Sequence, residues 1–75
     1  MEGTWSNGPG AVYDPHSHPY HKTLLCLKGS IEFTIEGEKG TVIRLKAGDI
    51  LELPPGTVHS ARVGPQGVTC SEEHR

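Results

Sequence analysis

The chain has 75 residues, with seven lysines and arginines against nine acidic residues and a formal net charge of −2 at pH 7. Nucleic-acid binding needs clustered cations facing phosphates, and these cations are scattered, so we expect no nucleic-acid partner. No apolar run approaches the roughly 20 residues that span a bilayer, and no signal-peptide pattern opens the chain, so we expect a cytoplasmic protein without a membrane partner. One domain this small has little core, which predicts help from a metal, from dimerisation or from both.

The two cysteines, Cys26 and Cys70, stand alone and far apart, which excludes a Cys-x-x-Cys zinc knuckle or redox pair. Each lies in an apolar strand pattern, where a free cysteine packs as a small hydrophobe. We therefore expect both in the core of a protein from a reducing compartment. A disulfide between them stays open as the alternative.

Residues 1–10 combine glycines and Pro9 with one large apolar residue, Trp5, and are predicted to form a loose N-terminal arm. After that, no window has the i, i+3, i+4 spacing of a helix. The pattern predicts one all-β domain over residues 11–72, followed by a polar tail at 73–75. His74 falls in that tail and is expected to have no role.

Short extended runs separated by Gly, Pro and charged turns predict about seven strands, which is typical of a β-sandwich or barrel. An unbroken apolar run predicts a central strand buried on both faces, and an alternating run predicts a strand with one inward face. A polar turn is predicted at 36–40, and the prolines and glycine at 54–56 predict a chain reversal. The unbroken apolar run is residues 23–27 and the alternating run is residues 31–36. The later predicted strands are residues 41–45, 50–53, 59–63 and 68–71.

Three of the five histidines lie within residues 16–21. His16 and His18 project from one face if the strand is extended, because strand side chains alternate with period two. Imidazole is the commonest nitrogen ligand of transition metals, so the pair is a candidate for metal binding. The alternative is two surface histidines in a loop, unless the chain supplies a third ligand and a cavity.

A third candidate ligand, His59, follows the reversal at 54–56. In an extended strand it shares a face with Ala61 and Val63, while Ser60 and Arg62 lie on the other face. Strand parity therefore predicts that His59 points into the protein.

Glycines, prolines and histidines recur at set offsets in two blocks. The first contains Gly10, His16, His18 and Gly29, and the second runs from Gly48 through the 54–56 turn to His59. Over residues 10–63 this spacing resembles the two signature blocks of the cupin superfamily. The resemblance implies a small double-stranded β-helix, a jelly-roll barrel, that holds one metal ion.

Matched position by position, the resemblance makes His16, His18 and His59 the metal ligands. The metal is then a divalent transition ion, either Fe, Mn, Zn, Ni or Cu. Where cupins commonly have a glutamate ligand, this chain has Lys22, and a protonated amine cannot bind a metal. Lys22 must lose its proton, turn toward the barrel mouth, or hold an anion between itself and the metal. We favour the anion.

Several neighbouring residues have open roles. His21 follows Pro19, so strand parity does not fix its direction, and it is a candidate fourth ligand, proton shuttle or rim residue. Lys22 and His21 are also the candidate catalytic groups. Cys26 lines the lumen if parity continues from Lys22, and the hydroxyl groups of Tyr13 and Tyr20 are candidates for the mouth.

We therefore expect a metal-binding cupin that takes a small anionic molecule, as a dioxygenase, an isomerase or a lyase. One alternative is a non-enzymatic barrel that senses or binds a small ligand. Another is a cationic pocket without metal, formed by Lys22 and protonated histidines. Exposed sheet edges on so small a barrel also predict a homodimer.

Overall fold

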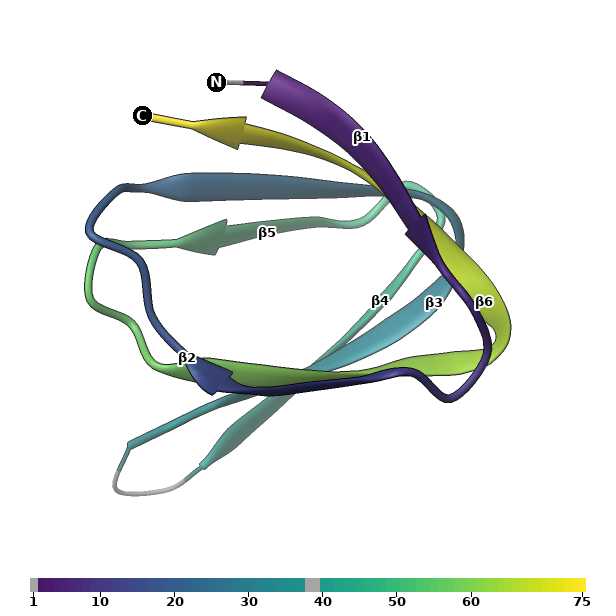
Figure 1. Cartoon of the computed structure of the whole chain (residues 1–75), viewed down its shortest axis with the longest axis horizontal. Helices are drawn as coiled ribbons and strands as arrows, with labels where there is room; N and C mark the ends of the chain where they lie inside the picture. Colours follow the sequence, from purple (N-terminus) through teal and green to yellow (C-terminus); the bar gives the residue numbers. More distant parts are fainter. Residues whose placement is uncertain (1, 38–39) are drawn as a thin grey trace.

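The computed structural model describes residues 2–37 and 40–75. These residues form six strands in one antiparallel system (Figure 1). Among them, no helix is long and apolar enough to cross a lipid bilayer. The middle of the predicted polar turn, residues 38 and 39, lies outside the described residues. The strands are β1 (Glu2–Asn7), β2 (Val12–His16), β3 (Lys22–Ile35), β4 (Thr41–Lys46), β5 (Ile50–Leu53) and β6 (His59–His74).

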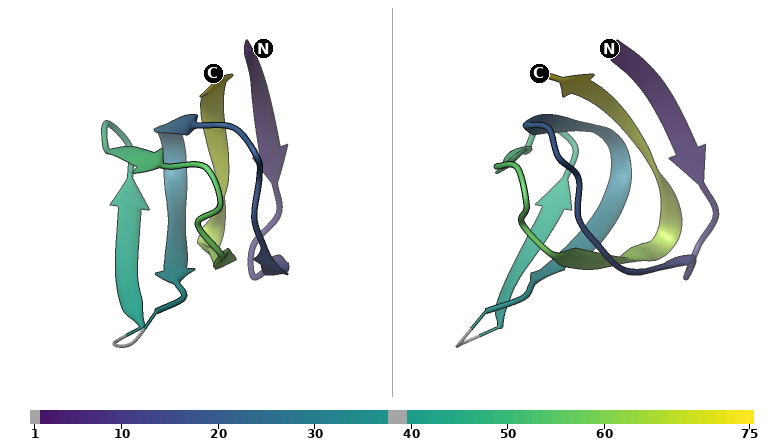
Figure 2. Two further views of the ribbon diagram at one scale, coloured as in Figure 1. Left: turned by 90° about the vertical axis from the view of Figure 1, so that its left-hand side faces the viewer. Right: turned by 60° about the vertical axis from the view of Figure 1, so that its left-hand side comes forward.

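The two long strands, β3 and β6, pair along almost their whole length and bend together halfway. The first half of β3 pairs with β5, and the second half of β6 pairs with β1. Beyond the bend, β3 pairs with β4, while the first half of β6 pairs with β2. The halves therefore form two facing sheets joined by the bends, as the views in Figure 2 show. The predicted all-β jelly-roll barrel is confirmed.

Two glycines allow the bend. Gly29 and Gly67 have φ angles of 74° and 80°, which side-chain-bearing residues rarely adopt. A Cβ built on Gly29 would lie 2.0 Å from the carbonyl oxygen of Gly67, so the two backbones meet too closely for any side chain. The register of β3 shifts on both sides of this point. The expectation of separate strands at 23–27 and 31–36, and at 59–63 and 68–71, was therefore wrong, because a bulged glycine bends a strand without ending its ladder.

The core lies between the two sheets. In β3, Ile31 and Phe33 are buried, as the alternating pattern predicted. The apolar run at 23–27 is different, because Leu24 and Cys26 are buried but Leu27 is 45% exposed. The prediction that this run is buried on both faces was wrong, since its strand has one face in the core and one outside.

Both ends of the chain are strands. β1 pairs with β6 from Glu2↔Glu73 to Asn7↔Val68, where a loose arm was expected. β6 continues through His74, and its end pairs with the start of β3. His74, which was expected in a polar tail, is thus part of β6 and is the register partner of Lys22.

Candidate metal centre

Three histidines from two segments meet at the open end of the barrel. β2 ends at His16, which is the register partner of His59 at the start of β6. His18 lies in the loop after β2, and its carbonyl oxygen accepts a hydrogen bond from the backbone N–H of Gly56 at 2.8 Å. This bond ties the two histidine-bearing loops together. Gly56 has a φ of 80°, a conformation that favours glycine, within the chain reversal predicted at 54–56.

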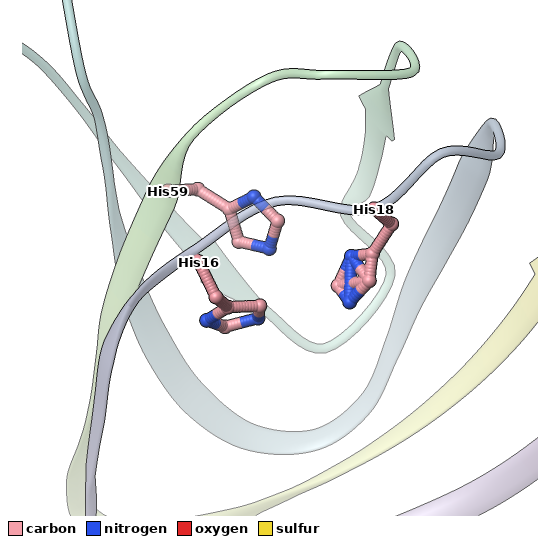
Figure 3. Close-up of side chains that lie close together, drawn as sticks. All are labelled: His16, His18 and His59. Atoms are coloured by element: carbon pink, nitrogen blue, oxygen red, sulfur yellow. The ribbon is translucent and has the colours of Figure 1, made fainter.

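One ring nitrogen from each of His16, His18 and His59 lies within 4.8 Å of the other two. Figure 3 shows the three rings converging on one point. The rings of His16 and His59 have centroids 4.4 Å apart, and those of His16 and His18 are 4.9 Å apart. His59 is 2% exposed, which confirms its predicted inward direction. A group of this kind can hold a metal ion.

The hydrogen bonds of two of these rings leave Nε2 available as a ligand. Nδ1 of His16 lies 2.7 Å from the carbonyl oxygen of Asp14, and Nδ1 of His59 lies 2.9 Å from that of Thr57. A carbonyl oxygen only accepts, so each Nδ1 carries the proton and donates it. Each Nε2 then keeps its lone pair, and this arrangement orients imidazole ligands in metal sites.

The neutral form that a metal requires is favoured for the imidazoles of His18 and His59. Burial lowers the pKa of His18, and the positive charges of Lys22 and neighbouring histidines lower it further. Burial also lowers the pKa of His59, with help from His16 and Lys22, against the opposing effect of its hydrogen bond to Thr57. Both imidazoles are therefore neutral at pH 7.

The cluster borders a cavity of about 270 Å³ between the two sheets. Tyr13 lines this cavity, and its hydroxyl oxygen accepts a hydrogen bond from Asn7 Nδ2 at 2.6 Å. Trp5 packs edge-on against Tyr13, so β1 closes one side. The cavity is lined by Trp5, Ser6, Tyr13, His16, Lys22, Leu24, Ile31, Phe33, His59, Ala61 and Glu72.

Lys22 points into this cavity, where it meets a carboxylate. Its Nζ lies 2.7 Å from Glu72 Oε2, and the two side chains are 14% and 19% exposed. Sequence reasoning missed Glu72, because β6 was expected to end at residue 71. Extending the parity of Cys70 by two residues would have turned Glu72 inward. Lys22 is thus paired with a carboxylate of the chain itself, and a small anionic molecule between Lys22 and the metal stays a prediction.

Residues outside the three-histidine group have other contacts. His21 Nε2 lies 2.7 Å from Glu52 Oε2 at the partly exposed edge, and its role as a fourth ligand stays a prediction. The Tyr20 ring stacks on His74 at 4.3 Å and also packs against His18 at 4.9 Å. His74, for which no role was expected, therefore supports the loop that carries His18.

The two cysteines are register partners on β3 and β6, and both are fully buried free thiols, as their core prediction requires. Burial raises the pKa of Cys70 to about 12, with a further contribution from Cys26. Leu24 lines the cavity, whereas Cys26 is not among its lining residues. The thiol of Cys26 instead faces the carbonyl oxygens of Lys28 and Gly29.

Comparison with known proteins agrees with this fold and site. Residues 3–67 match the family described as "Cupin domain", and the chain therefore belongs to the cupin family. It is also 40% identical over 60 residues to quercetin 2,3-dioxygenase of Bacillus subtilis (strain 168). That match covers 77% of this chain and 17% of the relative, so the chain spans less than a fifth of the curated protein it matches.

Solved structures show the same fold. A variant of Bacillus subtilis oxalate decarboxylase superposes with a TM-score of 0.88 at 25% identity, over 97% of this chain and 20% of that one. The cupin domain of Drosophila melanogaster CENP-C superposes with a TM-score of 0.92 at 19% identity, over 100% of this chain and 60% of that one. Another structure of the Drosophila protein contains CENP-C bound to CAL1. At 19% identity this likeness concerns the fold alone.

Proposed function

We propose that this chain binds one divalent transition metal through His16, His18 and His59. The observation that carries the proposal is the convergence of the three ring nitrogens within 4.8 Å, with Nε2 left free on two rings by backbone hydrogen bonds. Fe, Mn, Zn, Ni and Cu all accept imidazole ligands. Mn(II) centres are named for the oxalate decarboxylase relative. A metal held by three protein ligands keeps open positions for a ligand and acts there as a Lewis acid.

The charges around the cluster favour a small anionic ligand. Three neutral imidazoles leave the charge of the metal intact, and Lys22 and Glu72 balance each other across 2.7 Å. The cavity with metal is therefore positive, which attracts an anion. The relatives named quercetin 2,3-dioxygenase and oxalate decarboxylase support chemistry on a small molecule, as a dioxygenase, an isomerase or a lyase.

A non-enzymatic binding role is the second candidate. The CENP-C cupin domain, which in one structure is bound to a protein, CAL1, has the same fold, so the fold is compatible with a binding role. A binding role needs the cavity but no turnover. Metal-loaded protein that binds small anions and leaves every tested substrate unchanged would support this candidate over the enzyme.

We also propose a homodimer that pairs through the outer face of β3 and β5. Leu25 and Ile50 are register partners there, and Ile50 is 62% exposed. Leu27, two residues after the half-buried Leu25, is 45% exposed, so two exposed apolar side chains and a half-buried one lie along this strand pair. Sedimentation at micromolar concentration should give a dimer, and Leu27→Glu should give a monomer. A wild-type monomer would contradict this proposal.

Elemental analysis of protein purified without an affinity tag tests the metal proposal. After reconstitution we expect about one equivalent of metal, since three histidines define one site. His59→Ala should abolish binding, whereas His21→Ala, a histidine outside the group, should keep it. Under about one tenth of an equivalent in the wild type, or full occupancy in His59→Ala, would contradict the proposal.

A further inference from the structure

The ion pair between Lys22 and Glu72 lies on the wall of the metal-site cavity. Both side chains are largely shielded from solvent. They come from different strands, Lys22 from the start of β3 and Glu72 from the end of β6. His74 Nε2, which is on the same strand as Glu72, lies 3.5 Å from the same carboxylate oxygen.

Glu72 is negatively charged at neutral pH. Burial works against the charged form, but the bond to Lys22, its positive charge and the contact with His74 together lower the pKa of Glu72. The group of side chains that could hold a metal ion contains the three histidines but not Glu72. The Glu72 carboxylate therefore lines the cavity beside the three histidines, and Lys22 balances its negative charge.

Much of the rest of the cavity wall is apolar. Its largest apolar side chains are Leu24, Ile31 and Phe33. They offer no partner for a second charged group, and an unpaired buried charge is costly. The polar groups that remain on the wall, among them the hydroxyl groups of Ser6 and Tyr13, carry no positive charge, so Lys22 is the lining side chain that would pair with a second carboxylate.

We propose that Glu72 biases the cavity against dianions, so that the affinity for dianions relative to small organic monoanions is lower than it would be without this carboxylate. The inference rests on the proposed function, because the metal supplies the charge that attracts the ligand. Glu72 pairs with the lysine that would hold a second carboxylate, and it repels that carboxylate directly. The repulsion by Glu72 and the attraction to the metal both scale with the product of the charges, so the contribution of Glu72 is the change in the dianion-to-monoanion affinity ratio when its charge is removed.

Two four-carbon acids, butyrate and succinate, test this selectivity because they differ mainly by one charge. Each is titrated at pH 7.5 into the cobalt(II)-loaded protein, and binding is followed by the visible absorption of the cobalt. The variant is Glu72→Gln, which keeps the shape and removes the charge. The matched control is Glu73→Gln, because Glu73 is the next residue of β6 and pairs with Arg75 outside the cavity.

In Glu72→Gln the affinity ratio of succinate to butyrate should rise about tenfold, because the ammonium of Lys22 becomes available to the second carboxylate. Glu73→Gln should keep the wild-type ratio. Lys22→Met provides an independent test should Glu72→Gln fold poorly. It leaves the negative charge of Glu72 unbalanced, so the affinity ratio of succinate to butyrate should fall below that of the wild type.

The proposal is overturned by a failure of both acids to bind the loaded protein, or by succinate-to-butyrate affinity ratios that do not change in Glu72→Gln and Lys22→Met. A protein that takes up no cobalt is a separate result, because it contradicts the proposed metal site and is measured before either acid is added.

Discussion

Substituting Gly29 by alanine tests how the barrel is built around its cavity. The two long strands bend where Gly29 meets Gly67, and the bend places Lys22 and Glu72 in one sheet and His59 in the other. An alanine Cβ would lie 2.0 Å from the Gly67 carbonyl oxygen and 2.8 Å from its carbon, so backbone must move. Gly10 is a matched control, because its φ of 72° equals that of Gly29 within 2° and nothing lies within 4 Å of its Cβ position.

The expected magnitude has two parts. The left-handed backbone conformation costs a residue with a side chain about 1 kcal/mol, which both variants share. Forcing extra volume into packed structure adds about 2 kcal/mol, which only Gly29→Ala bears. The total of about 3 kcal/mol is a large part of the stability of so small a domain and lowers its Tm by roughly 12–24 °C. Gly10→Ala should lose about 4–8 °C.

Thermal unfolding followed by circular dichroism measures both variants at one pH and protein concentration. Matching concentrations matter because a dimer makes the Tm depend on concentration. If Gly29→Ala loses no more stability than Gly10→Ala, the contact with Gly67 does not constrain the bend and the explanation of the two-sheet architecture is refuted.

Three further predictions concern the site and the core. Lys22→Glu places a carboxylate where cupins commonly have one. Metal affinity, measured against a competing chelator, should therefore rise about tenfold, and butyrate binding should weaken. No change in either affinity would show that Lys22 is not part of the site. In metal-free protein, stability should be fully present above pH 6.5 and fall as the pH drops. The reason is that His18 and His59 bind protons at a higher pH in the unfolded chain than in the folded one, so His59→Gln should reduce this fall. A second loss, from Glu72, should begin only below pH 4.5, and a Tm that is flat from pH 7.5 to 5.5 would contradict the assignment. Iodoacetamide at pH 8 should modify Cys26 and Cys70 only after unfolding, since both are buried and the pKa of Cys70 is about 12, and rapid labelling of native protein would contradict their burial.

Short-range patterns were enough to predict an all-β sandwich or barrel, the inward direction of His59 and the burial of Ile31 and Phe33. These features depend on residues within one strand or one turn, where periodicity carries the information. The jelly-roll barrel and the grouping of His59 with His16 and His18 came instead from the resemblance to the two cupin signature blocks.

Features that depend on pairing between distant strands were missed. Glu72 meets Lys22 only because β3 and β6 pair in one particular register, across 50 positions of sequence, and no local pattern specifies that register. The unbroken lengths of β3 and β6 were missed because Gly29 reads as a strand end, although here it bends the strand. Leu27 was expected inside, because an apolar run does not distinguish a strand buried on both faces from one with an exposed apolar face.

Anomalous X-ray diffraction from crystals of the metal-reconstituted protein tests the central claim most directly. We predict one strong peak within coordination distance, about 2.1 Å, of one ring nitrogen each of His16, His18 and His59, with Nε2 as the ligand atom of His16 and His59. A peak beside His21 and Glu52, or beside His74, with none at the three-histidine group, would contradict the account.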